Sequence, residues 1–71
     1  MMKRGSKWEA NVHHHAYRAE IAFLEGNYAL RQKHLKRLYA LVPDNHAGMK
    51  RMEEIVHRAT LQAHKDFRES K

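Results

Sequence analysis

The 71-residue sequence contains no cysteine, one proline and only three glycines. Without cysteine the chain can form neither a disulfide nor a thiolate metal site. The scarcity of proline and glycine favours long helices with short connections, and no alternating β-branched pattern predicts a strand. A chain of this length is expected to form one small domain with a modest core.

Long apolar runs are also missing from the sequence. No stretch approaches the roughly 18 apolar residues of a membrane span, so we expect no membrane association. The basic start MMKRGSKWEANV is not followed by the apolar run that a signal peptide requires. Together with the lack of cysteine, these features predict an intracellular, cytoplasmic protein.

Local signals at the helix ends predict three helices. Ser6 and Glu9 match a capping box, in which the two side chains satisfy free amide groups reciprocally. Gly26 favours the left-handed conformation that ends a helix, and Pro43 excludes the residue before it from a helix. Asp44 is the candidate N-cap of the third helix. The prediction is a flexible basic tail over residues 1–6 and a single domain over 7–71, with helices at about 7–25, 28–42 and 45–69.

Apolar residues recur at helical spacing on each predicted helix. The first helix carries two such stripes, which predicts that it packs against two neighbours. Because short connections make consecutive helices antiparallel, the predicted fold is all-α, an antiparallel helical hairpin followed by a third long helix. Gly48 is expected to cost the third helix about 1 kcal/mol relative to alanine. The stripes are Trp8, Val12, Ala16, Ala19, Phe23 and Ala10, Tyr17, Ile21, Leu24 on the first helix, Tyr28, Leu35, Leu38, Val42 on the second, and Met49, Met52, Ile55, Val56, Ala59, Ala63, Phe67 on the third.

The turn between the first two predicted helices resembles that of a tetratricopeptide repeat. Gly26, Asn27 and Tyr28 match the family's glycine, polar residue and tyrosine, and Pro43 with Asn45 matches the end of its second helix. With Ala19, Leu35 and Leu41, the resemblance covers about residues 12–45, or one repeat. It implies a TPR-like hairpin whose third helix is similar to the extra helix that caps such arrays. The signature is partial, and the positions that depart from it are His15, Arg18, Ala22 and Arg31.

The charge is strongly positive, with 14 Lys and Arg against 8 Asp and Glu for a net charge of +6. The segment from Asn27 to Val42 alone carries four cations and no acid. Such a surface suits an acidic protein surface or phosphates, or simply keeps the protein soluble. The sequence shows no helix-turn-helix spacing and no aromatic ladder, which favours a protein partner over nucleic acid. The candidate contact residues are Arg31, Lys33, Lys36, Arg37, Lys50 and Arg51.

Two aromatic residues on the first helix are candidate interface anchors. Trp8 and Tyr17 belong to different apolar stripes, and aromatic side chains on a second stripe often carry binding energy. If the third helix covers that stripe, both residues belong to the core instead.

Seven histidines raise the question of a metal site. His13, His14 and His15 are consecutive, so on a helix their side chains point about 100° apart and cannot all face one ion. No two histidines are four residues apart, and no His-Glu-x-x-His motif occurs. We therefore predict no metal and no cofactor, but a charge that rises in acid.

The sequence gives little support to catalysis. It has no cysteine nucleophile, no glycine-rich phosphate loop and only dispersed acidic residues. We therefore predict a small basic non-enzymatic protein that binds and modulates or adapts a larger protein partner. Its general look is that of small intracellular or phage-encoded modulators. The alternatives are a protein that binds nucleic-acid phosphates and a structural helical homodimer.

Overall fold

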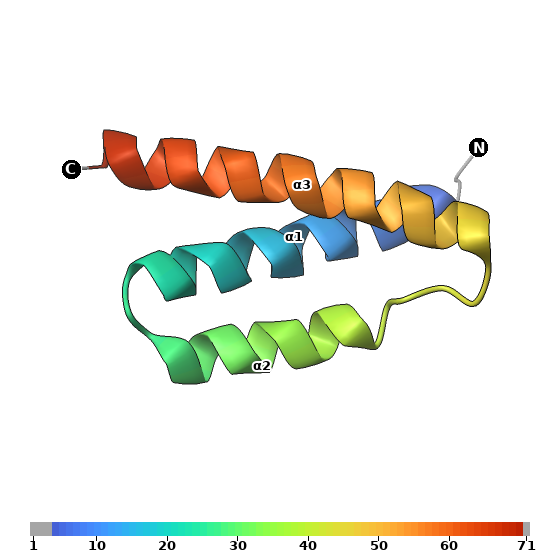
Figure 1. The fold of residues 1–71 in the computed structure, drawn as a ribbon, viewed down its shortest axis with the longest axis horizontal. Helices are drawn as coiled ribbons and strands as arrows, with labels where there is room; N and C mark the ends of the chain where they lie inside the picture. Colours follow the sequence, from blue (N-terminus) through green and yellow to red (C-terminus); the bar gives the residue numbers. More distant parts are fainter. Residues whose placement is uncertain (1–3, 71) are drawn as a thin grey trace.

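The computed structural model describes residues 4–70, with the side chains described from Lys7 onward. These residues form three helices. Helix α1 spans Arg4–Leu24, α2 spans Tyr28–Tyr39 and α3 spans His46–Glu69 (Figure 1). The predicted all-α fold of a hairpin followed by a long helix is confirmed. None of the described helices is both long and apolar enough to cross a membrane.

Two helix boundaries differ from the predicted ones by three residues, and two others differ by one. Helix α1 begins at Arg4, so position 6, the predicted N-cap, lies inside the helix. Of the predicted flexible tail over residues 1–6, residues 4–6 are helical, and residues 1–3 lie outside the described residues. Helix α2 ends at Tyr39, because its last turn tightens. There the amides of Leu41 and Val42 donate to the carbonyls of Leu38 and Tyr39, three residues back.

Helix α1 lies between the other two helices (Figure 1). It packs against α2 on one side and α3 on the other, whereas no Cα atom of α2 lies within 8 Å of one in α3. The three helices run antiparallel to their neighbours along the chain. The prediction that the first helix has two packing partners is thus confirmed, and α2 and α3 are left without direct backbone contact.

The connections are short and capped by asparagine side chains. Gly26 turns the chain after α1 with φ of 80°, in the left-handed region, as predicted. Asn27 caps α2 by accepting a hydrogen bond from the Leu30 amide. Asn45, not the predicted Asp44, caps α3, since its Oδ1 lies 2.6 Å from the Gly48 amide nitrogen.

The core is small and centred on α1. Its buried apolar residues follow the predicted stripes only in part. Tyr28 and Val42 were predicted to be buried, yet 61% and 44% of their surface is exposed, and Met49 is 45% exposed. These three predictions are wrong. Val42 and Met49 line an open space between α2 and α3, whose backbones do not approach each other, and Tyr28 lies at the start of α2 with its ring centroid 6.1 Å from that of the exposed Phe23. The buried residues are Val12, Ala16, Ala19, Ala22, Leu38, Met52, Ile55, Ala59 and Ala63.

Gly48 is needed where it stands, contrary to the simple propensity argument. A Cβ atom at this position would lie 2.8 Å from Cγ of Pro43 and 2.9 Å from the capping Oδ1 of Asn45. Both distances are shorter than van der Waals contact. The glycine therefore allows the Pro43 turn to close onto the first turn of α3.

We predict that Gly48→Ala lowers the free energy of unfolding. In an open helix alanine would gain about 1 kcal/mol, but here overpacking against Pro43 should produce a net loss of about 1 kcal/mol. Urea unfolding followed by circular dichroism measures the difference. Lys50→Ala, an exposed change in the same turn, should alter the value by less than about 0.5 kcal/mol. A Gly48→Ala variant more stable than wild type would contradict the packing argument.

Candidate functional site

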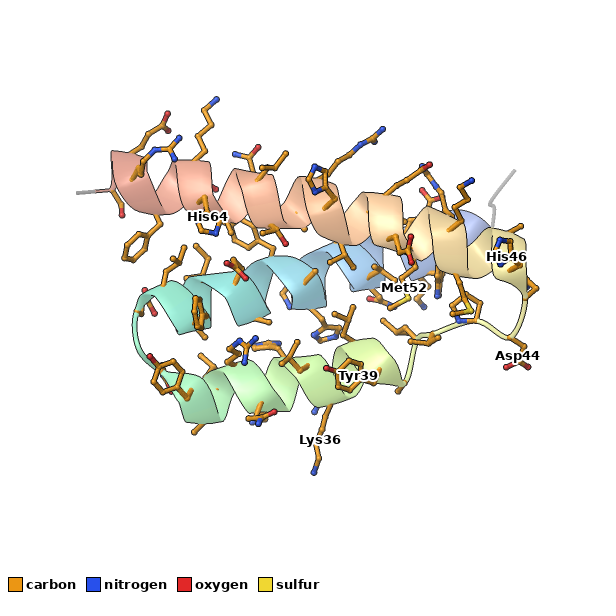
Figure 2. All side chains as sticks on the ribbon, viewed as in Figure 1. Lys36, Tyr39, Asp44, His46, Met52 and His64 are labelled. Carbon is orange, nitrogen blue, oxygen red and sulfur yellow. The ribbon has the colours of Figure 1, made fainter. Side chains whose placement is uncertain are left out.

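An apolar groove lies where α2 and α3 fail to meet. It has a volume of about 500 Å³ and runs past the end of α2 and the first half of α3. Glu53 and His57 of α3 also line this groove. Figure 2 shows Met52 and Tyr39 on the two sides of the space between these helices. The apolar lining consists of Leu38, Tyr39, Val42, Met49, Met52 and Val56.

Several lining side chains of the groove are strongly exposed for apolar residues. Tyr39 has 66% of its surface in solvent, and Val42 and Met49 each have nearly half. Contiguous exposed apolar surface of this kind marks a contact site more often than isolated exposed residues do. Sequence periodicity did not reveal the groove, since it cannot tell which flank of a helix a neighbour covers.

Two of the six predicted contact cations are engaged within the chain. The Arg51 guanidinium pairs with Glu9 at 3.0 Å and Glu54 at 3.1 Å, and its hydrogen bond holds the pKa of Glu9 below the usual value. The Arg31 guanidinium lies over the Phe23 ring, 5.1 Å from its centroid. These two cations therefore have structural contacts that join α1 to its neighbours.

The other predicted cations remain on the surface. Lys33, Lys36 and Arg37 are exposed on α2, and Lys50 is exposed on α3. Among the described residues, no ion pair joins these four to a carboxylate. Lys36 points away from the bundle in Figure 2. It precedes Tyr39 by three residues, so the two residues are neighbours on the helix surface.

Trp8 and Tyr17, the predicted interface aromatics, contact other parts of the chain. Both are half-buried against the core. The Trp8 indole N–H donates to the Leu41 carbonyl at 2.8 Å, which ties α1 to the chain just after α2. The Tyr17 hydroxyl donates to the Asp66 carboxylate of α3. Neither residue lines the groove, where the aromatic side chain is that of the exposed Tyr39.

Carboxylates join α1 to α3 at three points along the interface. Besides the pair of Arg51 and Glu9, His64 Nε2 lies 2.7 Å from a Glu20 oxygen. The third is Asp66, whose pKa is lowered because it accepts the Tyr17 hydrogen bond. The same bond raises the pKa of Tyr17.

Three histidines meet on the other side of α1. His34 of α2 approaches His15 of α1, with the two Nδ1 atoms 3.1 Å apart, and His14 lies beside both rings. The sequence did not predict this meeting, because the register between the helices decides it. Within residues 4–70, no group of three or more histidine or acidic side chains is placed to hold a metal ion.

The chain matches no family model, no curated protein and no solved structure. The resemblance of residues 12–45 to a tetratricopeptide repeat therefore stays a prediction.

We predict that Tyr17→Phe destabilises the fold at neutral pH but not in strong acid. The folded-state pKa of Asp66 is depressed from 3.8, so its contribution is complete above that value and is lost as pH falls through the folded-state pKa. Below it the carboxyl is protonated in both states. Urea unfolding of wild type and variant at pH 7 and about pH 2 tests this. A stability gap of the same size at both values would contradict the assignment.

Proposed function

We propose that this protein is a non-enzymatic helical module that binds a larger, acidic protein. It would take an amphipathic helix of that partner into the groove between α2 and α3. The observation that carries the proposal is the groove itself, an exposed apolar surface between two helices whose Cα atoms come no closer than 8 Å. Because so small a chain offers little surface, the expected role is to modulate or adapt the larger partner.

The shape of the groove favours a helix as its occupant. Two helices that flank an open apolar space leave room for a helix of the partner. A helix bound in such a groove contacts it with apolar side chains at positions i, i+3, i+4 and i+7. Met49 and Met52 lie on the α3 wall. Methionine side chains are flexible and polarizable, so they adapt to irregular apolar contacts.

The charge distribution favours an acidic partner. The chain carries a net charge of +6. Lys36 is exposed three residues before the groove residue Tyr39, and Lys50 shares a hollow with the groove residue Met49. Glu53 is the one carboxylate that lines the groove. Acidic flanks on the partner helix would thus speed association and fix its orientation, with weaker binding at high salt.

Nucleic acid is the second candidate, and the exposure of Lys33, Lys36 and Arg37 on α2 supports it. Contacts from these three residues to phosphates would give a slope of about −3 in a plot of log affinity against log salt concentration. Such binding would not depend on the apolar groove, so variants of the groove distinguish the two proposals.

We predict that selection from a phage-displayed library of helical peptides enriches sequences with an apolar stripe and flanking Asp or Glu. Tyr39→Ser and Met49→Ser should each weaken the selected peptides by about tenfold, because both side chains border the groove. Fluorescence polarisation with a labelled peptide measures the affinities.

Leu61→Ser is the matched control, since Leu61 is 58% exposed on α3 but does not line the groove. It should leave peptide affinity within about twofold of wild type. If all three variants lost peptide affinity to the same extent, the groove would not be the binding site. Salt-sensitive binding to random duplex DNA that survives both groove changes would favour the nucleic-acid alternative. A stable dimer at high dilution whose interface buries Tyr39 would favour the structural homodimer.

A further inference from the structure

The two interfaces of α1 are built from different chemistry. Towards α3, each of the three polar side-chain contacts described above contains a carboxylate. Towards α2, the polar contacts are the Trp8 indole bond to the Leu41 carbonyl and the contact between His15 and His34. Among the described residues, no carboxylate hydrogen bond or ion pair joins α1 to α2.

The histidine contact requires a neutral ring. The Nδ1 atoms of His15 and His34 are 3.1 Å apart, so one must donate and the other must accept with a lone pair. If both rings are protonated, two N–H groups and two positive charges face each other. His14 adds a third ring, with its centroid 5.0 Å from that of His15 and 6.0 Å from that of His34.

The groups around this cluster make protonation harder. Burial and the charge of His14 lower the pKa of both His15 and His34. Arg37 of α2 acts in the same direction on both rings.

Two further cations reinforce the effect on His34, and they are Arg18 of α1 and Lys33 of α2. Glu25 is the one carboxylate in the hollow that holds His14 and His34, and no hydrogen bond joins it to either ring. Helix α3 does not pack against α2, so it brings no carboxylate to this side.

We propose that weak acid releases α2 from α1 while α1 and α3 stay docked. Protonation of His15 and His34 would replace their hydrogen bond by repulsion inside a cationic cluster. Between α1 and α3, by contrast, His64 faces the Glu20 carboxylate and not another cation. Acid above the titration range of carboxylates therefore weakens the contact between α1 and α2 and leaves the carboxylate contacts between α1 and α3 in place.

The expected pH window follows from the direction of the shifts. The folded-state pKa values of His15 and His34 lie below 6.5, so the folded chain binds fewer protons than the released one. The contribution of this contact to docking is complete above pH 6.5 and is lost as pH falls through the folded-state values. Loss of docking also displaces Leu38 and Tyr39 from the groove wall. Only this last consequence rests on the proposed function.

Trp8 is a built-in reporter of the release, because it is the only tryptophan and its indole bonds to the chain just after α2. We expect its fluorescence emission to shift to longer wavelength as pH falls from about 7.5 to about 5. His34→Asn keeps a polar side chain but cannot titrate, so its emission should stay constant over this range. His57→Asn, which removes an exposed histidine on α3, should behave as wild type.

Amide NMR of the wild-type chain provides a second measurement that does not depend on any variant. On acidification, signals of residues 28–39 should move towards random-coil positions before those of residues 46–69 change. A constant Trp8 emission in wild type, an equal shift in His34→Asn, or simultaneous loss of both sets of amide signals would each overturn the proposal. None of these results depends on partner binding, so they leave the proposed groove function to its own test.

Discussion

The structure depends on the ability of α1 to pack against a helix on each side. Small residues make this possible, because Ala16, Ala19 and Ala22 are buried and let the neighbouring helices come close. Val12, at the centre, has no exposed surface. With no disulfide to brace the chain, each close approach of helix backbones among the described residues involves α1. A change that widens α1 would therefore disturb both interfaces at once, whereas a change in α2 or α3 disturbs one.

The same arrangement explains why a groove exists and why its two walls differ. Because the buried faces of α2 and α3 both pack against α1, the flanks of α2 and α3 that face each other remain apolar and open. Helix α3 is long and joined to α1 by carboxylate contacts, which makes it the firm wall. Helix α2 contributes one buried side chain, Leu38, and is joined to α1 by Trp8 and the histidine cluster. The wall that would respond to pH is thus the one that carries Lys33, Lys36 and Arg37, three of the four predicted contact cations without an ion pair.

Signals that act along the chain were predictable from sequence, and contacts between helices were not. Gly26 and Pro43 placed the turns correctly, because they act on the local backbone. The exposure of Tyr28 and the contact between His15 and His34 depend on how far each helix is rotated and shifted against its neighbour. Helical spacing identifies an apolar stripe but not the flank that a partner covers. Gly48 shows the same limit, since its cost was predictable and its contact with Pro43 was not. Arg31 departs from the repeat family, and its position over Phe23 could not be read from either residue alone.

Solvent accessibility of individual methyl groups tests the central claim of an open groove most directly. A soluble gadolinium complex added to methyl-labelled protein speeds relaxation of the methyl groups it can reach. The account predicts that Val42 and Met49 respond about as strongly as Leu61, which is exposed outside the groove, while Val12 and Ile55 are protected. If Val42 and Met49 were protected to the same degree as Val12 in the monomer, α2 and α3 would be in contact and the groove would not exist.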